Sequence, residues 1–160
     1  LKTLLFLTER GAKVILISHL GRPKTGPEDK LRLEPVAKRL SELMPCKVHY
    51  AKEVIGPEVD EKLETLKDGE ILLLENVRFH KEETANDDNF AKQLSSYGDL
   101  FIQEAFGTCH RAHASTVGIA KYLHFIIRSI KHNCHVVTAK NHVMARRSNW
   151  FTSSWFKQVV

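Results

Sequence analysis

Three arginines of this sequence each follow a short apolar run, and an arginine guanidinium can grip a phosphate or a carboxylate through two parallel hydrogen bonds. One such arginine in a loop is usually solvated or part of a weak surface ion pair. Three arginines brought to one place would instead form a site for a small polyanion. The three are Arg22 after residues 14–17, Arg78 after residues 71–74 and Arg111 after residues 100–102.

Other polar residues lie next to these arginines in the sequence. Ser18, His19 and Gly21 come just before Arg22, and His110 comes directly before Arg111. A lone loop histidine is more often hydrogen-bonded within the protein than in contact with a ligand. Beside converging arginines, however, His19 and His110 become candidate hydrogen-bond donors to the same anion.

Metal and nucleotide sites have little support in the sequence. His110 and His113 are three residues apart, and Cys109 is adjacent. A zinc site needs three or four ligands at suitable spacing, and these residues do not complete such a set. The sequence also lacks a glycine-rich phosphate loop with its lysine. We therefore predict neither a metal site nor a nucleotide site in this chain.

A parallel sheet is the element that would bring the arginines together. Continuous apolar strands separated by amphipathic helices are typical of an α/β fold, a parallel sheet with helices on both faces. Ligands of such sheets bind outside the carboxyl ends of the strands, which is where the arginines lie. The predicted strands are 14–17, 48–50, 71–74 and 100–102; the predicted helices are one ending before Gly11, one over 33–44, one from Pro57 to before Gly69, and one capped at 86–88 and ending at Gly98.

Charge divides the chain near Leu123. Residues 1–123 contain 18 Lys and Arg against 19 Asp and Glu, whereas residues 124–160 contain 6 Lys and Arg and no acidic residue. We predict that the second segment is poorly ordered, with a short helix around 125–130 and a strand at 136–137. Its basic composition fits an arm that binds nucleic acid or a membrane. We favour the other explanation, a coding sequence that has left its proper frame or exon.

Length and composition indicate one ordinary globular domain. The chain has 160 residues, of which 42% are hydrophobic and 27% charged, and no apolar run approaches the ~20 residues of a membrane span. We expect no signal peptide at the start of the sequence. The three cysteines, Cys46, Cys109 and Cys134, are odd in number and form no close pair, so we expect reduced thiols.

Four segments, in order and at matching spacing, resemble the phosphoglycerate kinase family. The resemblance covers nearly all of residues 1–123 and implies a Rossmann-like lobe, the N-terminal lobe of a two-lobe kinase. Members of that family transfer a phosphoryl group between ATP and the carboxylate of 3-phosphoglycerate, in glycolysis or carbon fixation. The segments are VILISHLGRP, LEPVAKRLSELM, LLLENVRFHKEE and AFGTCHRAHASTVGIAKYL.

The resemblance also implies which residues bind the acid. A further catalytic arginine of the family would lie before Leu1, so no catalytic residue is assigned here. Gln103 and Glu104 stand where the family has Asn and Asp, and Cys109 stands where alanine is typical. The implied substrate-binding residues are Ser18, His19, Gly21, Arg22, Arg78, His110 and Arg111.

Cofactor, partners and location follow from the same resemblance. Mg-ATP or Mg-ADP binds the other lobe of the family, so we expect none on this chain, which we expect to be inactive alone. The expected ligands are 3-phosphoglycerate and 1,3-bisphosphoglycerate, on a monomer without membrane or nucleic-acid contacts. The expected compartment is the cytoplasm, or the chloroplast for a plastid form. The alternative is a non-catalytic module that binds anions or nucleic acid through the basic segment 124–160.

Overall fold

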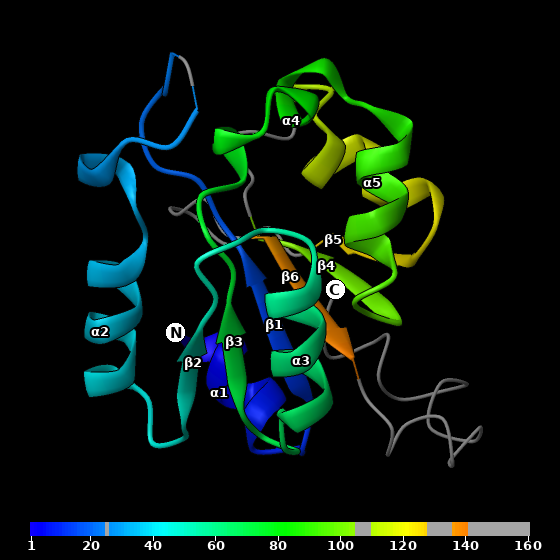
Figure 1. Ribbon diagram of the computed structural model, residues 1–160. Helices are drawn as coiled ribbons and strands as arrows, with labels where there is room; N and C mark the ends of the chain where they lie inside the picture. Colours follow the sequence, from blue (N-terminus) through cyan, green and yellow to red (C-terminus); the bar gives the residue numbers. More distant parts are fainter. Residues whose placement is uncertain (25, 105–109, 128–135, 141–160) are drawn as a thin grey trace.

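The computed structural model describes residues 1–24, 26–104, 110–127 and 136–140 as an α/β fold (Figure 1). Its helices are α1 Lys2–Thr8, α2 Glu34–Leu43, α3 Pro57–Thr65, α4 Lys81–Ala85 and α5 Asp88–Ser95. Its strands are β1 Lys13–Ile17, β2 Val48–Tyr50, β3 Ile71–Leu73, β4 Leu100–Gln103, β5 His124–Ile127 and β6 Val136–Lys140. Short helical turns are η1 Asp29–Leu31, η2 Val77–Phe79, η4 Ala114–Gly118 and η5 Ile119–Lys121.

The six described strands form one sheet in the order β2-β3-β1-β6-β4-β5. β1 and β2 both pair in parallel with β3, and β4 pairs in parallel with β5. β6 lies between β1 and β4 and runs antiparallel to both. The sheet therefore consists of two parallel parts joined by one antiparallel strand.

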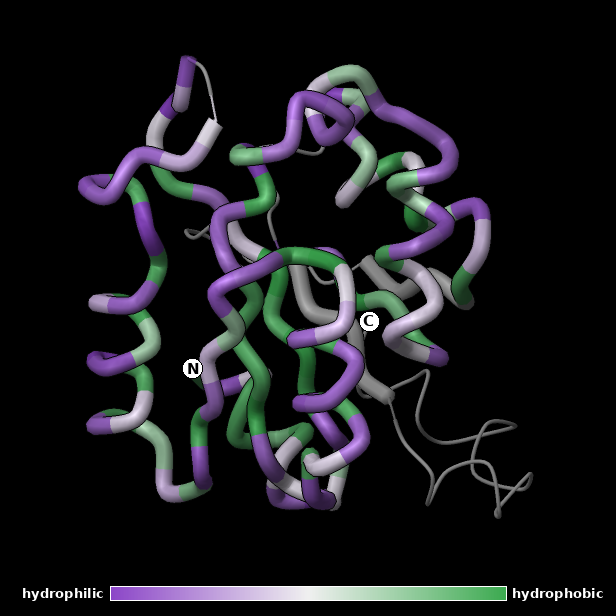
Figure 2. The backbone as a smooth tube through the Cα atoms, viewed as in Figure 1, coloured by the Kyte–Doolittle hydropathy of each residue, from purple (hydrophilic) through white to green (hydrophobic). Residues whose placement is uncertain are grey.

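Alternate residues of the strands face two separate apolar layers, because successive side chains of a strand point to opposite faces. Ile15 of β1 belongs to a cluster with Val59 of α3 and Leu94 of α5. Val14 belongs to the cluster that contains Leu7 of α1, to which α2 also contributes. Helices thus cover both faces (Figure 1), and α2 is hydrophobic toward the sheet and hydrophilic on its outer side (Figure 2).

Local sequence signals explain where the main helices begin. Pro35 and Pro57 lie in the first turns of α2 and α3, where the missing proline N–H costs no helical hydrogen bond. Asp87 caps α5, because its Oδ1 accepts a hydrogen bond from the backbone N–H of Phe90 at 2.8 Å. These signals determine where the helices between successive strands begin.

Most of the predicted elements are present at their predicted places. The helix expected around 125–130 is wrong for residues 125–127, which belong to β5, and backbone pairing with β4 accounts for their extended conformation. Residues 128–130 lie outside the described residues. The strand expected at 136–137 is present and extends to Lys140. The short elements η2 and α4 were not predicted. The division of the chain at residue 123 stays a prediction, and within the described residues no helix has the length and apolarity to span a membrane.

Candidate anion-binding site

The side chain of Asn76 holds the loop after β1, residues 18–33, against the end of β3. Asn76 is fully buried, and its Nδ2 donates to the carbonyl oxygens of Leu20 at 2.8 Å and Leu31 at 2.9 Å. Its Oδ1 accepts from the N–H groups of Leu20 at 3.3 Å and Arg78 at 3.1 Å. An amide side chain has two donor hydrogens and two acceptor lone pairs, so Asn76 uses its full capacity to join the loop to the segment that carries Arg78.

The buried carboxylate of Glu75 fixes the far end of the same loop. Its Oε1 accepts hydrogen bonds from the N–H groups of Leu33 at 2.9 Å and Asn76 at 2.8 Å. Its Oε2 accepts from Arg32 Nη1 at 3.1 Å and from the hydroxyl of Tyr50. Burial, reinforced by the hydrogen bond to Glu75, raises the pKa of Tyr50 above its usual value, so the hydroxyl remains a donor.

Arg78 is joined directly to the loop that carries Arg22. Its Nη1 donates to the carbonyl oxygen of Gly21 at 2.8 Å. Gly21 has φ +66°, and a Cβ at this position would lie 2.6 Å from Leu31 Cδ2. Glycine is the residue that takes up this left-handed conformation at little cost, so the bend that presents Arg22 beside Arg78 depends on Gly21.

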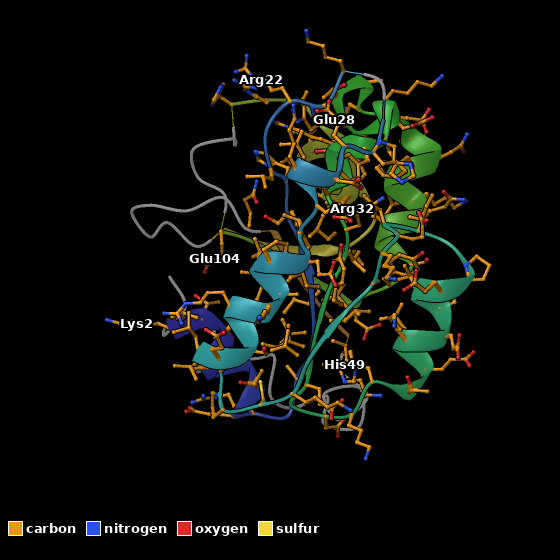
Figure 3. The ribbon with its side chains drawn as sticks, turned by 60° about the vertical axis from the view of Figure 1, so that its left-hand side comes forward. Lys2, Arg22, Glu28, Arg32, His49 and Glu104 are labelled. Atoms are coloured by element: carbon orange, nitrogen blue, oxygen red, sulfur yellow. The ribbon has the colours of Figure 1, made fainter. Side chains whose placement is uncertain are left out.

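The tip of the loop is closed by Glu28. Its carboxylate accepts a hydrogen bond from the N–H of Lys24 at 3.1 Å and forms an ion pair with Lys30 at 3.1 Å. The hydrogen bond from Lys24 and then the one from Lys30 lower the pKa of Glu28. Figure 3 shows Glu28 and Arg22 near the same end of the molecule and His49 near the opposite end.

The segment after β4 supplies the other wall of the site. Arg111 Nε donates to His110 Nε2 at 3.3 Å. Two residues further on, His113 Nδ1 lies 3.5 Å from Oε1 of Glu83. The same carboxylate accepts hydrogen bonds from the N–H and the hydroxyl of Ser115, at 2.9 and 2.7 Å. Glu83 and Ser115 are 32 residues apart in the sequence, and their contact attaches this segment to α4.

These segments surround one cavity of 660 Å³. The arginines that follow the three strands, Arg22, Arg78 and Arg111, all line it, so residues far apart in the sequence meet at this cavity. The wall also includes His80 and His113. Its residues with formal charge are five cations and one carboxylate: Arg22, Lys24, Arg78, Lys81, Arg111 and Glu82.

Gly21, His19 and His110 do not belong to the described wall of the cavity. Gly21 takes part through its carbonyl oxygen, which accepts from Arg78, and His110 through its hydrogen bond with Arg111. His19 is half-buried in the loop just before Gly21. Cys109 lies outside the described residues, as do Arg146 and Arg147 of the basic segment 124–160.

Ser18 is the predicted residue that lies elsewhere. It is buried and lines a second, more apolar cavity of 610 Å³ between α1, α2 and the sheet. Glu104 lies on the same cavity and accepts a hydrogen bond from the Thr3 hydroxyl at 2.7 Å. Ser18 contributes to the first site through its backbone, since its carbonyl oxygen accepts from the N–H of Val77 at 3.1 Å.

Several contributors to the site were not predicted from the sequence. Lys24, His80 and Lys81 follow the same strand ends as the predicted arginines, so proximity to those arginines is the signal that could have found them. His113 follows the predicted strand 100–102, as Arg111 does, but it was not among the residues assigned to the anion. Nothing in the sequence marks Asn76, because its partners Leu20 and Leu31 lie 56 and 45 residues away.

The donor set favours an anion over a metal ion. Guanidinium and ammonium groups carry hydrogens toward a ligand and offer no lone pair. Across the part of the chain that the structure describes, no group of three or more His, Cys, Asp or Glu side chains is placed to hold a metal ion.

Comparison with known proteins finds relatives over most of the chain. A family model described as Phosphoglycerate kinase matches residues 1–145. A chloroplastic phosphoglycerate kinase of Volvox carteri is 60% identical over 121 residues, which are 76% of this chain and 26% of that protein. A phosphoglycerate kinase of Dictyoglomus turgidum is 57% identical over 123 residues, 77% of this chain and 31% of that protein. The chain spans less than a third of the length of these relatives.

Solved structures agree with the relatives found by sequence. Phosphoglycerate kinase from Pyrococcus horikoshii matches with a TM-score of 0.70 and 37% identity, over 79% of this chain and 33% of that one. The enzyme from Coxiella burnetii matches with a TM-score of 0.65 and 35% identity, over 79% and 31%. The predicted α/β fold and the predicted family resemblance are confirmed.

Proposed function

Because the chain belongs to the phosphoglycerate kinase family, we propose that its arginine-lined cavity binds 3-phosphoglycerate and, in the reverse direction, 1,3-bisphosphoglycerate. The observation that carries the proposal is the convergence of Arg22, Arg78 and Arg111 on one cavity. The ligand offers a carboxylate and a phosphate, and the phosphate carries about −1.5 to −2 charges at pH 7. Three planar guanidinium groups suit two such acceptors.

The proposed reaction is phosphoryl transfer between ATP and the carboxylate of the acid. A carboxylate oxygen of the acid forms a bond to the γ-phosphorus of ATP. The bond between the γ-phosphorus and the β,γ-bridging oxygen breaks at the same time, which gives an acyl phosphate and ADP. Catalysis of this type relies on positioning and on electrostatic stabilisation of the transferring group. The share we assign to this chain is to bind and orient the acid, with Arg22, Arg78 and Arg111 offsetting its negative charge. We place the Mg-ATP or Mg-ADP substrate on a further part of the enzyme.

Titration with 3-phosphoglycerate, followed by NMR on the 160-residue chain, tests the site. We expect a dissociation constant on the order of millimolar, about −4 kcal/mol, with shifts around Arg22, Arg78 and Arg111. Arg78→Ala should abolish these shifts, because it removes a guanidinium and the link to Gly21.

Two controls make the result specific. Arg10→Ala removes an arginine whose guanidinium stacks on Phe6 of α1, and it should leave binding intact. Replacing both Arg146 and Arg147 by Ala tests the alternative, a module that binds anions or nucleic acid through the basic segment. Shifts that survive Arg78→Ala, or that vanish with Arg146 and Arg147, contradict the proposal.

A coupled assay tests the isolated chain for turnover. We expect no ATP-dependent conversion of 3-phosphoglycerate above blank, because the resemblance assigns to this chain the acid-binding lobe alone.

The relatives include a chloroplastic and a bacterial enzyme, and we propose the cytoplasm as the compartment, with the chloroplast as the alternative. We also propose that the chain is monomeric.

A further inference from the structure

The carboxylate of Glu83 lies behind the anion cavity without lining it. Glu83 is 2% exposed and belongs to α4, whose neighbouring residues Glu82 and Thr84 do line the cavity. A negative charge this close opposes the binding of an anion. Burial of a carboxylate also carries a desolvation cost unless the group is well hydrogen-bonded. Favourable contacts of Glu83 must therefore outweigh both the repulsion of the anion and the desolvation cost.

Three contacts of Glu83 show what it holds in place. Its two oxygens accept from the N–H and the hydroxyl of Ser115, at 2.9 and 2.7 Å, which anchors the start of η4. Its Oε1 also lies 3.5 Å from Nδ1 of His113, an ion pair when the imidazole is protonated. The His113 side chain is 14% exposed and lines the cavity.

A carboxylate at one ring nitrogen is a common means of setting the orientation and proton position of an imidazole. With Nδ1 directed at Glu83, Nε2 is the ring nitrogen left for a ligand. An imidazole that carries a proton on both nitrogens donates from both.

We propose that Glu83 is a positioning residue of the anion cavity: it holds His113 with Nδ1 turned inward, so that Nε2–H donates to the bound phosphate or carboxylate. This inference rests on the proposed function of the cavity. It assigns to His113 the role of ligand contact and to Glu83 a role that acts through His113.

Two isosteric variants of α4 separate positioning from simple charge. Glu83→Gln and Glu82→Gln each remove one negative charge near the cavity. If only charge mattered, both would bind inorganic phosphate more tightly. We expect Glu82→Gln to raise phosphate affinity and Glu83→Gln to lower it about tenfold, the size expected for one hydrogen bond to a charged group. In a His113→Ala background, Glu83→Gln should cause no further loss.

Long-range 1H–15N spectra of the histidine rings provide a readout that needs no ligand. We expect the His113 Nδ1 resonance to move in Glu83→Gln and to remain unchanged in Glu82→Gln. If the wild-type chain fails to bind phosphate, the proposed function fails, while the ring spectra still report on the Glu83–His113 contact. Unchanged ring shifts in Glu83→Gln, or equal phosphate affinity in that variant and wild type, overturn the inference.

A further variant covers the case in which Glu83→Gln does not fold. Glu83→Asp keeps the charge but withdraws the carboxylate by one methylene group. We expect weaker phosphate binding and a displaced His113 Nδ1 resonance. Wild-type affinity together with a wild-type ring spectrum in Glu83→Asp would contradict the proposed positioning role.

Discussion

At the scale of single residues, the site depends on buried polar side chains that do not face the ligand. Asn76 satisfies two carbonyl oxygens and two N–H groups of the surrounding backbone. Removing such a side chain leaves buried partners without hydrogen bonds, and this costs more than the net value of a bond. The arginines line the cavity, but Asn76 joins the two segments that carry Arg22 and Arg78.

We expect Asn76→Ala to lower the free energy of unfolding by about 3 kcal/mol, since several buried hydrogen-bonding groups lose their partner. The loop that carries Arg22 should loosen, so phosphate affinity should fall as well. Urea denaturation and phosphate titration measure the two effects. The matched control is Asn89→Ala, because Asn89 is an exposed residue of α5. Equal stability of the two variants would contradict the assigned role of Asn76.

At the scale of elements, α5 and η5 are joined at their exposed ends by Asp88. The carboxylate accepts from the Tyr122 hydroxyl at 2.6 Å and from Lys121 Nζ at 2.9 Å. The hydrogen bond from Tyr122, followed by the one from Lys121, lowers the pKa of Asp88. The same bond raises the pKa of Tyr122. The stability that the ionised carboxylate provides therefore depends on pH.

A lowered pKa in the folded state means that Asp88 contributes stability above its unfolded pKa of about 3.9. That contribution is lost as the pH falls through the folded value. We expect Asp88→Asn to be less stable than wild type at pH 7, and the difference to shrink as acidification protonates the carboxylate of the folded wild type. Urea denaturation at pH 7 and at successively lower pH measures the difference. A stability gap that does not change with pH would show that the carboxylate charge is not involved.

At the scale of the whole molecule, β6 connects two parts of the sheet that otherwise share no strand pairing within the described residues. β2, β3 and β1 form one part, and β4 and β5 form the other. The predicted division at residue 123 and the observed position of 136–140 lead to different expectations. A poorly ordered segment exchanges its amide hydrogens quickly, whereas a central strand is protected.

Hydrogen exchange followed by NMR distinguishes these expectations. From the antiparallel ladders of β6 with β1 and β4, we expect amides of residues 136–140 to exchange about as slowly as those of β1. The exposed loop residues Asp29 and Lys30 provide a fast-exchanging internal reference. Exchange of 136–140 at the rate of that reference would show that β6 is not held in the sheet and would support the predicted division.

The sequence predicted what local patterns determine and missed what distant contacts determine. Apolar runs predicted β1 to β4, and the arginines that follow three strand ends predicted the cavity wall. The expected helix is wrong at residues 125–127, because pairing with β4 decides their conformation. Glu83 could not have been found, since its partner Ser115 is 32 residues away and lies in a helical turn with no sequence signal. Buried polar partners become visible only once the chain has folded.

The cluster of five cations around the cavity also determines how an anion reaches it. Residues 1–123 are nearly neutral in total, so the positive potential is local rather than spread over the surface. A charged cleft of this kind concentrates oppositely charged ligands at its mouth and speeds their diffusional encounter. The attraction acts over about 8 Å at physiological ionic strength, so added salt slows capture of the anion before it weakens the short contacts of the bound state.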